Sequence, residues 1–338
     1  AHLFEADLDL INNTLAEYFS KPRNQLFDEY EKKFTRNAIF RALKSYGLIT
    51  VSQRFNFEHK RRTINAENII GILPSSRHGK RDDKIMVIGA HYDTVINSPG
   101  VNDNGSGCVA TLEIARILSA FKGKLSASVY FVFFDEEEKG TRGSKVFVRN
   151  YLLPKVLHKK SKFIAALILD MVMAFDAKPN TQTLPSDVIE FCPYAVDWMR
   201  SNSNRGNFIA VFARSNVDSF IWQTLLDAWN AEQNTNFDLL PLDAPIPENR
   251  SYLNSRHRSS SFFRSDHLEF WLAPVNYYNF TALPAVQLWD LGVWRSQMKQ
   301  CYHKACDDLA NMKPENLQFL AYIIKSVTKA VIKLIEKS

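Results

Sequence analysis

The sequence has few cysteines and no apolar run that is long enough to cross a bilayer. Its four cysteines are Cys108, Cys192, Cys301 and Cys306, and none of them forms a C-x-x-C pair. Four cysteines are too few for a disulfide framework in a chain of this length, and their spacing does not suit a thiolate metal site. Low-complexity tracts and internal repeats are also missing, which excludes a repeat protein and a disordered chain. We expect no transmembrane segment.

The composition is that of an ordinary globular protein. The chain has 338 residues, of which 46% are hydrophobic and 23% are charged. This length suits one large α/β domain or two small ones, and because no linker is visible we predict a single domain over residues 1–338. The net charge is +6, with basic clusters at 59–63 and 77–84. Acids are interspersed and no nucleic-acid motif accompanies these clusters, so we expect solvated loops and no nucleic-acid partner.

Two weak features favour a secretory origin, the first residue and the glycosylation sequons. The sequence begins at Ala1 rather than at a methionine, which suggests a processed signal peptide or a trimmed chain. Glycosylation sequons begin at Asn12, Asn104, Asn249 and Asn279. Cys301 and Cys306 are close enough to bridge if the loop permits it, although their spacing leaves the question open. We therefore expect a secreted or luminal glycoprotein, and the oligomeric state stays open.

The pattern of apolar residues predicts alternating helices and strands. Residues 5–47 have the three- and four-residue spacing of helices, and residues 314–337 form a long amphipathic helix that begins at a proline. Buried strands are predicted at 84–93, 126–134 and 163–172, with helices between them. This order predicts a three-layer α/β/α sandwich with a central mixed, mostly parallel sheet. The stretch 176–265 is less regular, and we interpret it as an insertion or a lid.

Acidic residues and a histidine follow three of the predicted strands. His91 and Asp93 end the first strand, four carboxylates at 135–138 end the second, and Asp170 ends the third. A turn-rich loop places Asp103 immediately before a helix. Carboxyl ends of strands in open α/β sheets are where sites lie, so these side chains should converge. Their mutual repulsion would be severe without a multivalent cation.

The type of ligand indicates which metal is bound. Imidazole and carboxylates without thiolate suit Zn²⁺, with Co²⁺ or Mn²⁺ as replacements. The acids are too many for one tetrahedral ion, so two ions that share a bridging carboxylate fit them better.

Six short blocks resemble those of the co-catalytic di-zinc aminopeptidases, whose superfamily also holds glutaminyl cyclases, a glutamate carboxypeptidase and the transferrin receptor. They are HYDT at 91–94, GVNDNGSG at 100–107, EEKGTRGS at 137–144, LDM at 169–171, SDH at 265–267 and YHKACDDL at 302–309. Any one block is a weak signal, but all six occur in the order of the family.

The resemblance implies a role for each matching residue. One zinc ion would be held by His91 and Asp170, and the other by Glu138 and His303, while Asp103 would bridge the two ions. Asp93 would accept a hydrogen bond from the second ring nitrogen of His91, and Glu137 would be the general base.

A second histidine competes with His303 as the last ligand. The resemblance favours His303 and leaves Asp266, His267, Asp307 and Arg264 to line the pocket or to support the ligands. Tyr302 would supply a hydroxyl to the developing oxyanion. In some relatives that hydroxyl comes from a tyrosine five positions before the histidine of SDH, where this sequence has Phe262.

The resemblance implies zinc-dependent hydrolysis of peptides that releases N-terminal residues, with a metal-bound water as nucleophile and Glu137 as general base. Three alternatives remain: a glutaminyl-peptide cyclotransferase, a C-terminal exopeptidase, and a non-catalytic binding protein. In the second case Arg264, or the other arginines at 254–264, would clamp the substrate carboxylate. The complete set of ligands argues against the third.

Overall fold

The computed structural model describes residues 3–157, 161–233, 236–244, 246, 260–273 and 282–338. Its centre is a mixed sheet of eight strands in the order β1-β2-β4-β3-β5-β8-β6-β7. The strands are β1 (Ile49–His59), β2 (Arg62–Leu73), β3 (Lys84–His91), β4 (Ser128–Phe134), β5 (Lys162–Leu169), β6 (Phe208–Ala213), β7 (Asp238–Asp243) and β8 (Ala285–Trp289). The predicted α/β fold with a mixed central sheet is confirmed.

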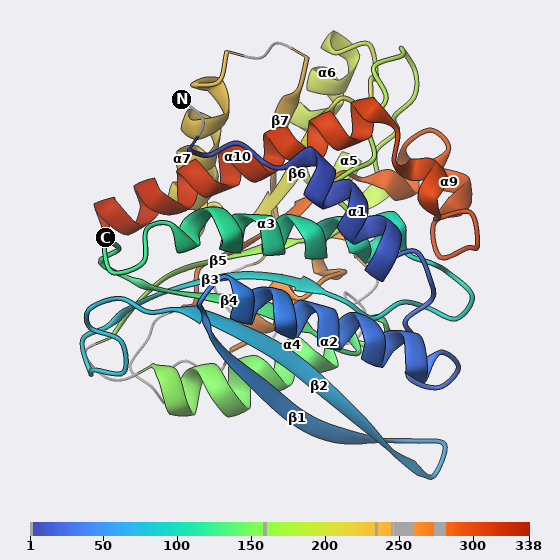
Figure 1. Cartoon of the computed structure of the whole chain (residues 1–338). Coiled ribbons are helices and arrows are strands. Elements are labelled where there is room, and N and C mark those ends of the chain that lie inside the picture. The colour runs from blue at the N-terminus through green and yellow to red at the C-terminus, as the bar shows by residue number, and fades with distance from the viewer. Residues whose placement is uncertain (1–2, 158–160, 234–235, 245, 247–259, 274–281) are drawn as a thin grey trace.

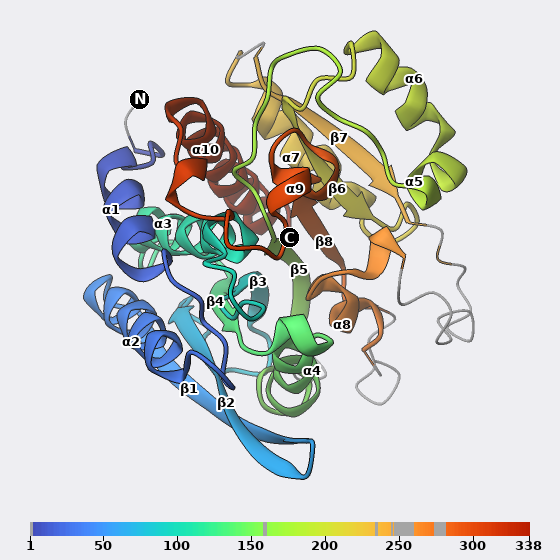
Figure 2. The same ribbon diagram turned by 90° about the vertical axis from the view of Figure 1, so that its right-hand side faces the viewer.

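Helices cover both faces of this sheet (Figures 1 and 2). One face packs against α1 (Leu8–Tyr18), α2 (Glu29–Ser45), α3 (Gly107–Ser119), α7 (Ser219–Asn230) and α10 (Pro314–Lys337). The other packs against α4 (Arg142–Phe147), α5 (Ser186–Phe191), α6 (Pro193–Ser201), α8 (His267–Trp271) and α9 (Met298–Cys301). Two hydrophobic cores result, one on each side of the sheet. Among the described residues, no helix is both long and apolar enough to span a membrane.

The apolar run of β4 shows why a central strand has no polar alternation. All seven of its residues are buried. Val129, Phe131 and Phe133 enter the core beneath α3 and α10. The residues between them, such as Val132, enter the opposite core beside Phe147 of α4. Because both faces of the sheet are covered by helices, both sets of side chains must be apolar.

Four neighbouring strands run in the same direction and set the position of the site. The pairs β3–β4, β3–β5 and β5–β8 are all parallel. Their carboxyl ends therefore lie at one edge of the sheet, which is the edge predicted to carry the polar residues.

The stretch 176–265 differs from the irregular insertion that we expected. It contains α5, α6 and α7 and contributes β6 and β7 to the sheet. The β6 sequence, FIAVFA, is short and fully buried, so periodicity cannot distinguish it from a piece of helix. Strand β7 contains Pro241 and lies at the end of the sheet, where the missing N–H costs no ladder hydrogen bond.

Candidate metal centre

Polar side chains stand at the ends of all four parallel strands. His91 is the last residue of β3, Asp135 follows β4, Asp170 follows β5 and Asp290 follows β8. We did not predict Asp290, although it ends an apolar run just as Asp170 does. Its buried carboxylate accepts the side-chain N–H of Asn102 at 3.0 Å and so supports the loop that carries Asp103.

Asp103 lies in a buried loop, Val101–Ser106, that is held from several sides. The carboxylate of Asp307 accepts the backbone N–H groups of Asn102 and Asp103, both at 2.9 Å. The side chain of Asn104 donates to the carbonyl of Leu169 at 2.8 Å and thereby ties the loop to the end of β5. The peptide bond between Asp103 and Asn104 is cis. Asp307, predicted as a supporting residue, orients this loop.

A buried arginine anchors the chain just before this loop. Arg23 is completely shielded from solvent, and its guanidinium group donates to the carbonyls of Tyr92 at 2.8 Å and Gly100 at 3.0 Å. It also donates to the carbonyl of Pro99 at 2.6 Å. The N-terminal segment is thus fastened to both ends of the loop that follows β3.

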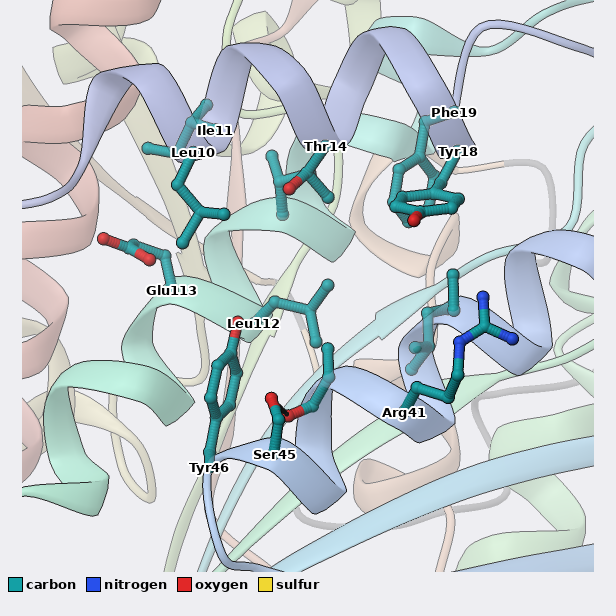
Figure 3. A pocket seen from close by; sticks show the side chains of 14 residues that line it. Leu10, Ile11, Thr14, Tyr18, Phe19, Arg41, Ser45, Tyr46, Leu112 and Glu113 are labelled. Carbon is teal, nitrogen blue, oxygen red and sulfur yellow. Dashed lines mark hydrogen bonds between the residues drawn. The ribbon is translucent and has the colours of Figure 1, made fainter.

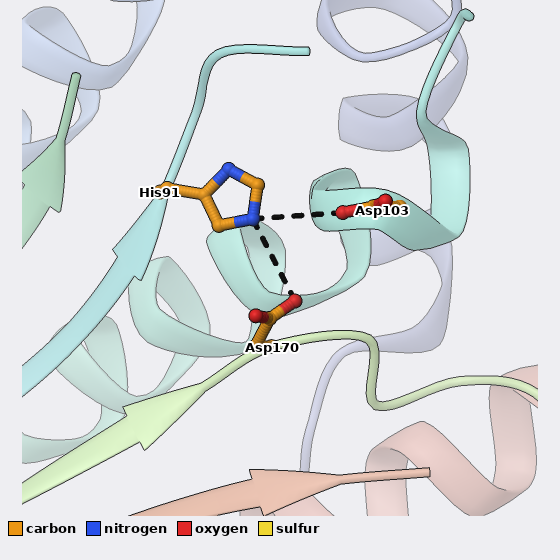
Figure 4. Close-up of side chains that lie close together, drawn as sticks. All are labelled: His91, Asp103 and Asp170. Atoms are coloured by element: carbon orange, nitrogen blue, oxygen red, sulfur yellow. Dashed lines mark ion pairs between the residues drawn. The ribbon is translucent and has the colours of Figure 1, made fainter. Parts of the chain in front are cut away.

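The first group of candidate ligands consists of His91, Asp103 and Asp170. The Nε2 atom of His91 lies 3.5 Å from an Asp103 oxygen and 3.6 Å from an Asp170 oxygen, as Figure 4 shows. The three side chains come from the end of β3, the loop before α3 and the end of β5. All three are buried.

The second group consists of Asp103, Glu138 and His303. The Nε2 atom of His303 lies 3.2 Å from Oδ2 of Asp103 and 3.2 Å from Oε2 of Glu138. Asp103 turns Oδ1 towards His91 and Oδ2 towards His303. One carboxylate therefore belongs to both groups, which is the position of a bridging ligand.

The distances in both groups fit zinc. Two atoms at about 2.0–2.2 Å from one tetrahedral ion are separated by about 3.3–3.6 Å. The four histidine–carboxylate separations lie between 3.2 and 3.6 Å. Oε1 of Glu138 is buried and finds no hydrogen-bond partner among the described residues. The donors are nitrogen and oxygen atoms, as zinc accepts, so the residues present fit the metal.

The four acids at 135–138 divide into two pairs. Glu137 and Glu138 face the candidate metal centre, where Oε2 of Glu137 lies 3.9 Å from Nε2 of His91. Asp135 and Glu136 instead contact the buried amine of Lys32, each at 2.5 Å. We predicted a cation for this run, and for half of it that cation is a lysine of α2. The only signal for this lysine in the sequence was that Asp135 and Glu136 had no expected role.

Asp93 organises the two glutamates as well as His91. Its Oδ1 atom lies 3.5 Å from Nδ1 of His91, and the Asp93 carbonyl oxygen lies 3.2 Å from the same nitrogen. The same carboxylate accepts the backbone N–H of Glu137 at 3.0 Å and that of Glu138 at 3.2 Å. One side chain therefore orients a candidate ligand and fixes the backbone that carries Glu137 and Glu138.

Burial and the neighbouring charges shift the pKa values of the metal-free site. Burial raises the pKa of Glu137 well above its usual value, and burial together with Asp103 raises the pKa of Glu138 to about 7. Burial lowers the pKa of His303, but the carboxylates of Asp103 and Glu138 outweigh it and raise the pKa to about 10. The pKa of His91 is raised well above its usual value for the same reason. Without a metal, these groups therefore hold protons, which a bound cation would displace.

Tyr302 and His303 lie in a loop closed by a disulfide bond between Cys301 and Cys306. The bridge that we left open from the spacing is therefore present. The ring of Tyr302 stacks on that of His303 with 3.7 Å between the centroids. The Tyr302 hydroxyl accepts a hydrogen bond from Arg264 at 3.0 Å. Arg264 thus contacts Tyr302, and Arg256 and Arg258 lie outside the described residues.

Asp266 and His267 are both buried, but only Asp266 lies near the candidate metal ligands. Burial raises the pKa of Asp266 to about 8, and its charge contributes to the raised pKa of Glu137. His267 points elsewhere, because its Nε2 atom lies 2.8 Å from the carbonyl oxygen of Phe262. Burial lowers the pKa of His267 to about 3. Of the two competing histidines, the structure brings only His303 to the carboxylates.

A cavity of about 360 Å³ lies between α1, α2 and α3, and none of the predicted site residues lines it. Figure 3 shows its mostly apolar wall, with Leu10 and Leu112 on facing helices and Glu113 and Arg41 at its margins. The carboxylate of Glu113 already has two partners, because it pairs with Arg116 at 2.7 Å and accepts the backbone N–H of Asp7 at 2.6 Å.

This sheet carries two groups of zinc-type ligands at the carboxyl ends of its parallel strands, which is where sites in open α/β sheets lie. Residues 68–219 match the family model of Peptidase family M28. Four of the six sequence blocks lie within these residues, and the resemblance to the zinc aminopeptidase superfamily is confirmed.

Comparison with known proteins gives relatives in the same superfamily. Aminopeptidase Y of Saccharomyces cerevisiae is 30% identical over 165 residues, which is 47% of this chain and 28% of that protein. An aminopeptidase of Pseudomonas aeruginosa is 40% identical over 101 residues, or 30% of this chain and 18% of that protein. The matching stretches thus span less than a third of these curated relatives.

The fold is shared over nearly the whole chain. BSAP, a zinc aminopeptidase from Bacillus subtilis, superposes with a TM-score of 0.66 at 16% identity and covers 97% of this chain and 95% of its own. A glutaminyl cyclase from Porphyromonas gingivalis gives 0.59 at 19% identity, with 100% and 99% covered. Both proteins therefore have the fold described here.

Proposed function

We propose that this protein is a zinc-dependent aminopeptidase that removes N-terminal residues from peptides. The observation that carries the proposal is the position of Asp103, whose two oxygens face the two histidines in separate ligand groups. The aminopeptidases among the relatives support hydrolysis of peptides in preference to cyclisation.

The two groups would each hold one Zn²⁺ ion. His91 and Asp170 would bind the first, Glu138 and His303 the second, and Asp103 both. When bound, the zinc ions would lower the pKa of a water molecule and polarise the scissile carbonyl group. Co²⁺ or Mn²⁺ would be accepted by the same oxygen and nitrogen donors.

Glu137 would act as the general base. It belongs to neither ligand group, yet it reaches to within 3.9 Å of Nε2 of His91. Its carboxylate would take a proton from the attacking water as the C–O bond forms, and deliver it to the leaving amine as the C–N bond breaks. The hydrogen bond from its N–H to Asp93 holds it at this distance.

Tyr302 would donate a hydrogen bond to the oxyanion. Burial and the nearby charges of Asp103 and Glu138 raise the pKa of Tyr302, so the hydroxyl keeps its proton at neutral pH. Because that hydroxyl accepts from Arg264, its own proton is free to point towards substrate.

Carboxylates beside the metals would bind the substrate's free α-amino group. This attraction between an ammonium group and the acidic site would set the preference for the N-terminus of a peptide.

A peptide that begins Gln-Leu tests the proposal when its mass is followed with and without a chelator. Stepwise loss of N-terminal residues that stops with the chelator and returns with added zinc supports an aminopeptidase. Loss of ammonia alone would instead indicate a cyclase, and loss from the other end a carboxypeptidase. A peptide left intact by the zinc-loaded protein, across several first residues, would contradict catalysis.

We also propose a secretory location. The Cys301–Cys306 disulfide supports it, because such bonds persist in oxidising compartments. Of the four sequons, Asn12 is exposed, Asn104 is buried, and Asn249 and Asn279 lie outside the described residues. Any glycan on the described part would therefore sit on Asn12, which mass spectrometry of the natively expressed protein would reveal.

A further inference from the structure

A fully buried lysine contacts the acid run next to the candidate metal centre. Lys32 is on α2, outside the part of the chain matched by the family model, and its side chain is 1% exposed. Its amine lies 2.5 Å from Oδ1 of Asp135 and 2.5 Å from Oε1 of Glu136. Nothing in the proposed reaction uses these three side chains.

The contacts continue from this ion cluster to the first ligand strand. The second oxygen of Asp135 accepts the hydroxyl of Tyr92 at 3.0 Å and the N–H of Glu67 at 2.9 Å. Tyr92 stands between His91 and Asp93 in the sequence, and its ring centroid is 6.0 Å from the Lys32 amine. Lys32 is therefore linked through Asp135 to Tyr92, the residue between His91 and Asp93.

The contacts also continue to the catalytic residues. Glu136 has a φ of 58°, which is a left-handed conformation that few residues other than glycine adopt. The chain turns there, and the next two N–H groups, of Glu137 and Glu138, point to the carboxylate of Asp93. The side chain of the residue at this turn, Glu136, is the one that pairs with Lys32.

Stability alone gives a poor reason for such an arrangement. A buried ion pair is often replaced by apolar residues without loss of stability, because desolvating the charges offsets their attraction. A buried cluster is better suited to fixing one particular arrangement of the backbone, since the charged partners have few alternatives in a dry interior.

We infer that Lys32 is a positioning residue: by binding Asp135 and Glu136 it sets the turn that points Glu137 at the substrate and Glu138 at the second zinc site. This inference rests on the proposed function for the role of Glu137, and on the ligand geometry alone for Glu138. Lys139 is the other lysine near Glu136. Its amine lies 3.2 Å from Oε2 of Glu136, but its side chain is partly exposed, so this pair contributes less to holding the turn.

The experiment compares four proteins. They are the wild type, Lys32→Met, the neutral triple variant Lys32→Met/Asp135→Asn/Glu136→Gln, and the control Lys325→Met. Lys325 also pairs with two carboxylates, those of Glu5 and Glu232, but it is on α10 away from the site. The triple variant removes the charges of Lys32, Asp135 and Glu136 together, so it avoids the two buried, unpaired acids that the single variant leaves.

Zinc titration of each metal-free protein by calorimetry is the main measurement, with urea unfolding and steady-state kinetics beside it. We expect the triple variant to unfold near the wild-type midpoint, yet to bind the second zinc about 10–100-fold more weakly, as when a supporting partner of a ligand is lost. Its kcat should fall while KM changes little. The control should match the wild type in zinc affinity.

If the folded triple variant had the zinc affinity and kcat of the wild type, the inference would be overturned. The charges of Lys32, Asp135 and Glu136 would then neutralise one another without positioning Glu137 or Glu138. Zinc affinity within twofold of the wild type in a folded Lys32→Met would also overturn the inference. The titration needs no substrate, so it separates the two proposals. A wild type that binds zinc but cleaves no peptide would contradict the proposed function and leave the positioning of Glu138 to be decided by the variants.

Discussion

The Oδ1 atom of Asp93 accepts the backbone N–H of Glu137 at 3.0 Å. Because the same carboxylate lies against the Nδ1 side of the His91 ring, a change at Asp93 would affect both a candidate metal ligand and the proposed general base. Asp93 therefore supports the site although it belongs to neither group of candidate ligands.

Asp93→Asn should weaken zinc binding by about 10–100-fold and lower kcat, since an amide cannot accept both N–H groups and also attract the imidazole proton. The zinc dissociation constant and kcat are measured together, with Asp197→Asn as a control on the exposed surface of α6. Equal zinc affinity in Asp93→Asn and the wild type would contradict the supporting role.

Glu137→Gln should keep both zinc ions and lower kcat by about 10²–10⁴-fold, because an amide cannot accept the proton of the attacking water. Metal content by atomic emission and the rate on a peptide substrate are the two measurements needed.

Glu138→Gln is the matched variant one residue along the chain. It should lower zinc content, since Oε2 of Glu138 is 3.2 Å from the ring nitrogen of His303. If zinc is lost from Glu137→Gln and kept in Glu138→Gln, the roles of the two glutamates are reversed.

The stability of the metal-free protein should depend on pH through His267. Its folded pKa is about 3, whereas an unfolded histidine titrates near 6.5. Between these values the unfolded chain binds more protons, so this contribution to stability is complete above pH 6.5 and is lost as the pH falls. From pH 7 to pH 5 the loss is about 2 kcal/mol.

His267→Gln keeps a donor for the Phe262 carbonyl but does not titrate. Urea unfolding at pH 7 and pH 5 gives the change in the free energy of unfolding for each protein. The contributions of the other titrating groups cancel when the two changes are subtracted. Between pH 7 and pH 5, the free energy of unfolding of the variant should fall by about 2 kcal/mol less than that of the wild type. The same loss in both would show that His267 is not held neutral.

The disulfide should affect the second zinc site, because it closes the loop that carries His303. The unfolded, unreduced protein should show two free thiols, those of Cys108 and Cys192, and four after reduction. The variant Cys301→Ser/Cys306→Ser should bind the second zinc about tenfold more weakly, as for other supports of a ligand. Four thiols before reduction would contradict the bridge.

The central strands could be predicted because burial on both faces leaves an uninterrupted apolar signature, as in β4. The convergence of His91 and Asp170 followed from the shared direction of their strands, whereas Asp135 contacts Lys32 instead. Strands β6 and β7 could not be found in this way, since FIAVFA is too short for its period to be read and β7 contains a proline.

The long-range partners of the site were beyond the sequence. Lys32 is 103 positions before Asp135, and nothing in the helical pattern of α2 distinguishes a buried lysine from an exposed one. Arg264 was predicted near the substrate, but its contact with the Tyr302 hydroxyl depends on how two distant loops pack. Such contacts depend on tertiary packing, which the periodicity of one segment does not encode.

Zinc titration of the metal-free wild type and of Asp103→Asn tests most directly whether one carboxylate serves two metals. The shared position of Asp103 predicts two equivalents of tightly bound zinc in the wild type, weaker binding of both in Asp103→Asn, and weaker binding of only one in Glu138→Gln. A single equivalent in the wild type, or an Asp103→Asn variant that loses only one of two, would contradict the bridged two-metal site.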